Sequence, residues 1–201
     1  MRIILPKTVP NLYAFQHVPL FFLAGPIRGG GDWQREMTEL LGKRGECVVV
    51  NPSRYEPDHP LYQYRLEGSE HFAHQTAWER FYLHLAAKDW SSGCIIFWLA
   101  CESKENPRDD GQPYARDTYG ELGEWRGRLL HDPKLRVIVG AEPDFPGLAV
   151  IRRNFEDAVG SSFRIYDTME EVVERAAYLL HQDDQPGYAV MQPAGFHRLK
   201  T

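Results

Sequence analysis

Short apolar runs alternate along this chain with longer stretches of helical period, and this alternation constrains the fold more than any other feature. In the longer stretches, hydrophobic residues recur every three or four positions, which is typical of amphipathic helices. The runs with the pattern of strands are 18–24, 47–50, 94–99, 135–139 and 163–166, and helices are predicted over 33–45, 71–88, 118–130, 149–159 and 169–180. Because such an exchange of strands and helices is typical of α/β domains, the sequence predicts a doubly wound α/β fold. Its five-stranded sheet is expected to be mainly parallel, with helices on both faces.

The length and the composition of the chain limit its domains and its partners. With 201 residues, of which 43% are hydrophobic, the chain can bury one substantial core. We expect one α/β domain over residues 1–181, followed by an extended tail over 182–201. The formal net charge of −5 provides no broad basic surface, so a nucleic-acid polymer is not an expected partner. A small anion could still bind locally.

The cysteines and the N-terminal segment bear on the cellular compartment. Cys47, Cys94 and Cys101 are odd in number and lack the C-x-x-C spacing of many metal and redox sites. The N-terminal segment lacks the apolar core and cleavage site of a secretory signal, and no 18 apolar residues run together. The sequence therefore predicts a cytoplasmic protein that has no membrane partner.

A glycine-rich loop follows the first predicted strand, in the sequence FFLAGPIRGGGDW at residues 21–33. In open α/β sheets, ligands bind beyond the carboxyl ends of the strands, near the point where the strand order reverses. Glycines let backbone N–H groups approach an anion, and Arg28 adds forked donors, although the same residues fit a plain tight turn. The candidate binding residues of this loop are Gly25, Pro26, Ile27, Arg28, Gly29 and Gly30.

A second motif, DTYGELGEW at residues 117–125, begins a predicted helix after a long loop. Thr118 and Glu121 have the spacing of a capping box, in which the glutamate accepts a bond from the amide of the cap residue. A carboxylate in the first turn is also held ionised by the helix dipole, as a nucleophile requires. The local sequence alone favours the cap.

Five motifs follow one another between about residues 20 and 180: FFLAGPIRGG, NP at 51–52, QTAWE leading to AKD at 75–89, IIFW at 95–98, and TYGELGEW. In order and spacing they resemble the nucleoside 2-deoxyribosyltransferase-like superfamily. The IRGG loop is also similar to that of deoxynucleoside 5′-monophosphate N-glycosidases. The resemblance implies a flavodoxin-like fold with strand order 2-1-3-4-5, a homodimer or larger homo-oligomer, and no cofactor.

The resemblance also implies roles for two carboxylates. The glutamate of the E-L-G motif, here Glu121, is the nucleophile in these families, and the aspartate that ends the second helix, here Asp89, assists at the base or the sugar. As in retaining glycosidases, one carboxylate attacks the sugar while an acid helps the leaving group depart. Asp89, Asp117 or water could supply that proton, and Asp89 also fits a plain turn residue. Where the transferases often have a further aspartate this chain has Ala115, which leaves base recognition open.

Further candidate residues stand near the expected cleft. Trp98 and Tyr119 are the aromatic residues expected to touch a base, although aromatics at such spacing more often lie in the core. Asn51 ends the second strand, where it either faces the rim of the cleft or caps the loop. Asp117 and Thr118 complete the expected substrate-binding set.

Two histidines are candidate metal ligands. His71 and His74 would share a face of the second helix, but no carboxylate or cysteine stands at a matching spacing. No metal site is predicted.

The expected function is cleavage or transfer at the N-glycosidic bond of a small-molecule substrate, a (deoxy)nucleoside or its 5′-monophosphate, through a covalent glycosyl-Glu121 intermediate. A second base would give transfer and water would give hydrolysis to free base, a choice governed by the loops 52–70 and 100–117. Arg28 beside the glycines favours a monophosphate, whereas Asp32 would repel it unless its carboxylate points outward. A non-catalytic nucleotide sensor and a NAD-cleaving enzyme are the alternatives.

Overall fold

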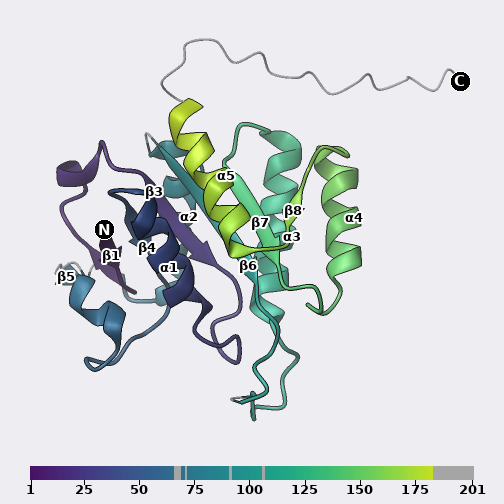
Figure 1. Cartoon of the computed structure of the whole chain (residues 1–201), viewed down its shortest axis with the longest axis horizontal. Coiled ribbons are helices and arrows are strands. Elements are labelled where there is room, and N and C mark those ends of the chain that lie inside the picture. Colours follow the sequence, from purple (N-terminus) through teal and green to yellow (C-terminus); the bar gives the residue numbers. More distant parts are fainter. Residues whose placement is uncertain (66–68, 71, 91, 106, 183–201) are drawn as a thin grey trace, which may run out of the picture.

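A sheet of parallel strands forms the centre of the molecule (Figure 1). The computed structural model describes residues 1–182 except 66–68, 71, 91 and 106. Within that part of the chain the sheet has six strands, in the order β1 (Arg2–Ile4), β4 (Val48–Val50), β3 (Leu20–Ala24), β6 (Gly93–Leu99), β7 (Val137–Ala141) and β8 (Ile165–Tyr166). Each neighbouring pair runs parallel. The expected α/β class and mainly parallel sheet are confirmed.

The expected number of strands was too low by one. Strand β1 pairs with β4 at the edge of the sheet, where Ile4 lies opposite Val50. Ile3 and Ile4 are fully buried there. The strand is only three residues long, so it shows no alternating pattern that could distinguish it from an apolar chain end.

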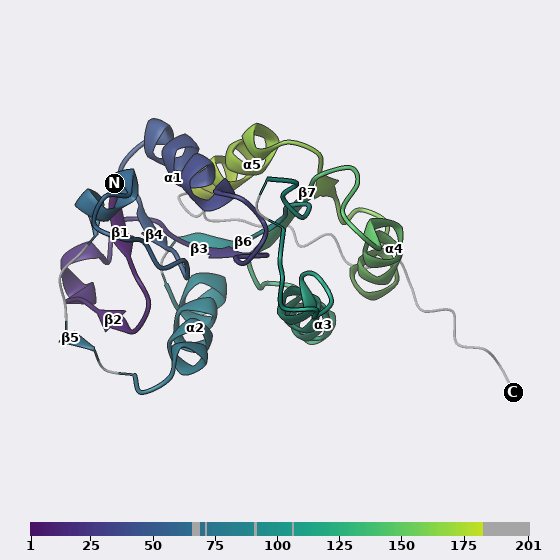
Figure 2. The ribbon, with the colours of Figure 1, turned by 90° about the horizontal axis from the view of Figure 1, so that it is seen from below.

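Helices cover both faces of the sheet, as expected (Figure 2). On one face lie α1 (Trp33–Arg44) and α5 (Met169–Gln182), and on the other lie α2 (Gln75–His84), α3 (Arg116–His131) and α4 (Leu148–Val159). Side chains of successive strand residues point to opposite faces. In β3, Phe21 and Leu23 therefore join the core under α1 and α5, while Phe22 and Ala24 join the core under the other helices.

Two smaller features frame the sheet. Strand β2 (Thr8–Val9) pairs antiparallel with β5 (Ser69–Glu70), and one-turn helices η1 (Leu12–Phe15) and η2 (Pro60–Tyr64) lie beside them in sequence. Helix α2 is shorter than expected, since it begins at Gln75 and continues into a π-helical turn, η3 (Leu85–Asp89). Of the expected tail over 182–201, residues 183–201 lie outside the described part of the chain.

The strand order reverses between β3 and β6, which are neighbours in the sheet. From β3 the chain crosses to β4 on one side, whereas β6 leads on to β7 and β8 on the other side. The two loops that leave β3 and β6 diverge at this point, which is where open α/β sheets form a crevice. None of the helices that the structure describes combines the length and the hydrophobicity needed to cross a lipid bilayer.

Candidate functional site

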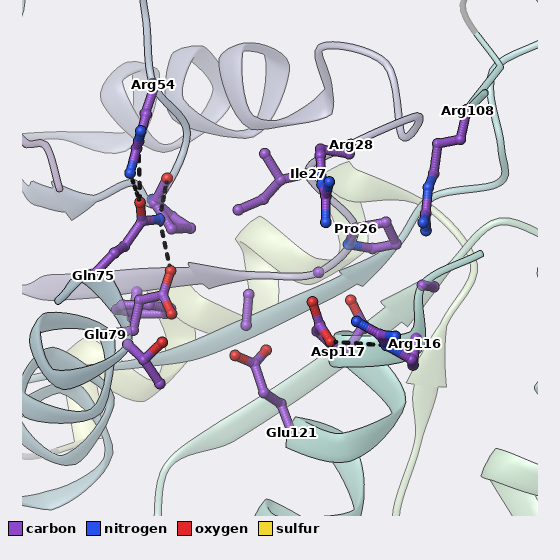
Figure 3. A pocket seen from close by; sticks show the side chains of 17 residues that line it. Pro26, Ile27, Arg28, Arg54, Gln75, Glu79, Arg108, Arg116, Asp117 and Glu121 are labelled. Carbon is purple, nitrogen blue, oxygen red and sulfur yellow. Dashed lines mark hydrogen bonds and ion pairs between the residues drawn. The ribbon is translucent and has the colours of Figure 1, made fainter. Parts of the chain in front are cut away.

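A cavity of about 600 Å³ opens at the carboxyl edge of the sheet, where the strand order reverses (Figure 3). Its walls come from the end of β3 and the loop that follows, from the start of α2 and from the start of α3. Seven expected site residues line it: Gly25, Pro26, Ile27, Arg28, Asp117, Thr118 and Glu121. The fold thus brings together two motifs that are about 90 residues apart in the sequence.

The glycines after β3 serve close packing of the backbone. A Cβ on Gly25 would stand 2.2 Å from the carbonyl oxygen of Trp98, and one on Gly30 would stand 2.5 Å from that of Pro26. The indole Nε1 of Trp33 donates to the same Pro26 oxygen at 2.7 Å. Gly29 and Gly30 do not line the cavity. The loop is therefore a tight turn whose first four residues, 25–28, face the cavity.

Glu121 lies in the second turn of α3, and the capping-box interpretation is wrong. The helix already begins at Arg116, after Ala115 in the left-handed conformation with φ of 55°. Thr118 is buried inside the first turn, so its hydroxyl is not at the cap position. Because the chain enters the helix two residues earlier than expected, Glu121 is free of a capping role and projects into the cavity.

The surroundings of Glu121 favour its protonated form. Burial raises the pKa of this carboxyl to about 7, and the negative charges of Glu79, Asp117 and Glu124 add to the effect. The expected stabilisation of the ionised form by the helix dipole does not prevail, because the side chain lies beyond the first turn and beside other acids. A carboxyl with a pKa of about 7 can gain or lose a proton at neutral pH.

Glu79, on α2, is a second carboxylate in the cavity that the sequence interpretation missed. Its Oε1 accepts a hydrogen bond from Nε2 of Gln75 at 2.8 Å, one helical turn earlier. Gln75 is held in turn, because its Nε2 also donates to the Pro52 carbonyl and its Oε1 accepts from Nε and Nη2 of Arg54 at 3.2 and 3.1 Å. Burial raises the pKa of Glu79, although the bond from Gln75 opposes the shift. The glutamate stands within the QTAWE motif, but the resemblance implied a role only for the aspartate at the end of the helix.

Asp89 lies near the amino ends of the parallel strands, whereas the cavity lies at their carboxyl ends. The expectation that it acts beside Glu121 is therefore not supported. Helix α2 runs antiparallel to the strands, so that Glu79 is near the cavity while η3 leads into the start of β6. The ten residues from Glu79 to Asp89 correspond to about 15 Å of helix. Asp89 is exposed there and does not line the cavity.

Three other expected residues also point away from the cavity. Asn51 is buried, where its Oδ1 accepts from the Ser53 amide at 2.9 Å and thus caps the loop after β4. Trp98 packs in the core under α1 and α5. The hydroxyl of Tyr119 donates to the Pro146 carbonyl at 2.6 Å, beside the start of α4. These side chains are structural because strand and helix periodicity turn them toward the core or a neighbouring segment.

Arginines line the cavity together with the carboxylates. Figure 3 shows Arg28 and Arg108 across the cavity from Glu121, with Arg116 beside Asp117. Arg54 completes the set beside Gln75. Arg54, Arg108 and Arg116 stand in long polar loops or at a helix start, and such positions carry no pattern that predicts a shared site.

The loop after β6 is docked on the loop after β3. Arg108 bonds both carboxylate oxygens of Asp110, at 2.6 and 2.7 Å, and Asp110 also pairs with Arg28 at 3.5 Å. The amide of Ser103 donates to the Gly29 carbonyl at 2.6 Å. A Cβ on Gly29 would meet Cγ of Arg108 at 2.8 Å, so a glycine is needed for this close approach.

Of the remaining polar candidates, Asp32 and His74 are not among the residues that line the cavity. The Asp32 carboxylate pairs with Arg35 at 2.9 Å and with His59 at 3.3 Å, and it does not line the cavity. It thus points outward, as a phosphate site next to it requires. His74 stands just before α2, and His71 lies outside the described residues. Among the described residues, no group of three or more potential ligands could hold a metal ion.

Comparisons with known proteins do not name a family. No family model matches the chain, and no curated protein matches it. The cavity itself indicates the chemistry, because it combines two half-buried carboxyls with a rim of arginines.

Proposed function

We propose that this protein cleaves or transfers at the N-glycosidic bond of a (deoxy)nucleoside or its 5′-monophosphate through a glycosyl-Glu121 intermediate. One observation carries the proposal: two half-buried carboxyls with raised pKa values, Glu121 and Glu79, line a single cavity from neighbouring helices. Cleavage with a covalent intermediate needs two such groups, one ionised to attack and one protonated to assist departure. Mutual repulsion of two acids favours a state in which one of them holds a proton. Attack requires that Glu121 is the ionised partner, and a pKa of about 7 lets it lose its proton at neutral pH.

The reaction follows from these two roles. The Glu121 carboxylate attacks C1′ as the C1′–N bond breaks, and the bonding electron pair leaves with the base. Glu79, in its protonated form, gives its proton to the departing base. Water or a second base then attacks C1′, the C1′–O bond to Glu121 breaks, and Glu79 recovers a proton from the attacking group. Hydrolysis or transfer results from the identity of that group.

The arginines support a substrate with a 5′-phosphate. Arg28 and Arg108 lie across the cavity from Glu121, so a sugar between them would direct its two ends to the carboxylate and to the guanidinium groups. Each charged hydrogen bond to the phosphate would contribute roughly 1.5 to 3 kcal/mol. The outward ion pairs of Asp32 remove the repulsion that this carboxylate would otherwise cause.

The fold class and assembly belong to the same proposal. Without the edge strand β1, the sheet order β4-β3-β6-β7-β8 is 2-1-3-4-5 in chain order, which supports a doubly wound, flavodoxin-like fold. This order is the one that the resemblance to the nucleoside 2-deoxyribosyltransferase-like superfamily implies. A homodimer or larger assembly is part of that resemblance and is testable by light scattering.

A panel of substrates tests the proposal. The protein is incubated with deoxynucleosides, their 5′-monophosphates, the ribo counterparts and NAD, and free base or nicotinamide is measured by chromatography. We expect base release from a deoxynucleoside monophosphate, together with exchange if a second base intercepts the intermediate. Binding without release at any protein concentration would favour a nucleotide sensor, and release of nicotinamide alone would favour a NAD-cleaving enzyme.

A further inference from the structure

A second hollow, of about 370 Å³, lies next to the candidate active site and shares one side chain with it. The turn at residues 5–8 forms one wall, and Tyr55, Tyr62 and Arg65 form the other. Arg54 lines both this hollow and the cavity that contains Glu79. Three basic residues, Lys7, Arg54 and Arg65, are among the residues that line the hollow.

Lys7 occupies an unfavourable backbone conformation at this hollow. It follows Pro6 in a turn closed by a hydrogen bond from the Thr8 amide to the Leu5 carbonyl at 3.2 Å, and its φ is 65°. This turn position favours glycine, because a side chain in the left-handed conformation is strained. Strain of this kind is retained at functional sites when the side chain has a role.

A second cation of the hollow is held in place by an aromatic ring. The guanidinium carbon of Arg65 lies 4.2 Å from the ring centroid of Tyr62, a cation–π contact that restricts its position. Basic side chains around a hollow of this size, two of them arginines held by their neighbours, match a small anion that carries several negative charges.

We propose that the second hollow binds a small phosphate-bearing anion, and that this anion modulates the neighbouring cavity through Arg54. The modulation rests on the function proposed above, whereas the binding does not. The bonded chain between the two spaces is visible in Figure 3: Arg54 donates to Gln75, and Gln75 donates to Glu79. An anion beside Arg54 would compete for its guanidinium and offset its charge.

The consequence for Glu79 follows from its charged surroundings, which are Arg54 on one side and Asp117 and Glu121 on α3. The charge of Arg54 lowers the pKa of Glu79, and Asp117 raises it. With Arg54 neutralised by a bound anion, the pKa of Glu79 rises further. The acid then stays protonated to higher pH, so the alkaline limb of the pH–rate profile for base release should move to higher pH.

Titration calorimetry with inorganic pyrophosphate tests the site without reference to activity. Lys7→Gly and Arg65→Gln should each weaken pyrophosphate binding about tenfold, since each removes a charged partner. Because glycine is the residue that this turn position favours, Lys7→Gly should fold. It therefore still tests the site if Arg65→Gln does not fold. If both variants bind pyrophosphate like the wild type while Arg28→Ala loses binding, the anion occupies the first cavity and the proposal is overturned.

The coupling is measured by the full pH–rate profile of base release with and without pyrophosphate. We expect pyrophosphate to move the alkaline limb to higher pH, and we expect Arg65→Gln, a change outside the first cavity, to abolish this shift. Pyrophosphate bound in the second hollow with an unchanged profile would overturn the coupling. A protein that binds pyrophosphate through Lys7 and Arg65 but releases no base from any substrate would contradict the proposed function and leave the anion site standing.

Discussion

The two ends of α2 and its continuation carry acids that look equivalent in the sequence but lie at opposite edges of the sheet. Glu79 lies near the start of the helix and lines the cavity, whereas Asp89 ends the π-helical turn and is exposed at the other edge. The difference arises because a helix that connects parallel strands runs antiparallel to them, so only its first turns reach the carboxyl edge. An acid near the start of such a helix is therefore a better candidate for catalysis than one at its end.

The largest expected effect is on Glu121. Glu121→Gln keeps the shape of the side chain but removes the attacking charge, so kcat for base release should fall at least about 1000-fold. The matched control is Glu156→Gln, an exposed glutamate on α4 that does not line the cavity. If the kcat of Glu121→Gln stays within a few-fold of the wild-type value, Glu121 is not the nucleophile.

The next effect tests the comparison between the two ends of α2. Glu79→Gln should lower kcat about 100-fold, because a positioned acid contributes roughly that much to departure of the base. Asp89→Asn should change kcat less than twofold, since the side chain is remote and exposed. Steady-state kinetics on both variants shows which acid assists departure of the base. A large loss of kcat in Asp89→Asn with little loss in Glu79→Gln would assign that role to Asp89.

A smaller effect concerns the free energy of unfolding, which shows whether the Glu121 carboxylate stabilises the fold. The folded pKa of about 7 lies above the ordinary value of 4.5, so the folded state binds the proton more tightly than the unfolded state. The contribution of Glu121 to the free energy of unfolding therefore falls as pH rises from about 4.5 through 7, and it is smallest above pH 7. Glu121→Gln should raise the free energy of unfolding by about 2 kcal/mol at pH 8 and change it little at pH 4. Urea denaturation at both pH values measures this, and destabilisation at pH 8 would mean that the carboxylate serves the fold.

The smallest effect concerns the 5′ end of the substrate. Arg28→Ala should lower kcat/KM for a deoxynucleoside monophosphate at least about tenfold and leave activity on the nucleoside nearly unchanged. Arg153→Ala is the control, because that arginine is exposed on α4 and does not line the cavity. Equal losses on both substrates would assign Arg28 to the fold or to the sugar.

Much of the fold could be predicted from the sequence because long apolar runs and helical periods are local signals. The edge strand β1 and the true start of α3 could not, since a three-residue strand has no period and Ala115 gives no sign of its left-handed conformation. Both ends of an element depend on tertiary contacts that a local pattern does not contain.

The candidate site was predictable where a motif directly follows a strand or begins a helix, as with residues 25–28 and Glu121. It was not predictable where the contributors are brought together by the fold alone. Arg108 reaches the cavity because its loop docks on Gly29, and Arg54 does so through Gln75. No spacing in the sequence links these residues, because the distances between them are set by the crossing of separate segments at the sheet edge.

The covalent intermediate on Glu121 is the central claim, and trapping tests it most directly. A 2-fluoro-2-deoxyarabinosyl nucleotide slows breakdown of such an intermediate, and after incubation the protein is digested and its peptides are weighed by mass spectrometry. The account predicts a fluorosugar phosphate adduct on the peptide that contains Glu121, formed together with one equivalent of free base and absent from Glu121→Gln. Release of base without any adduct, or an adduct on a different residue, would contradict it.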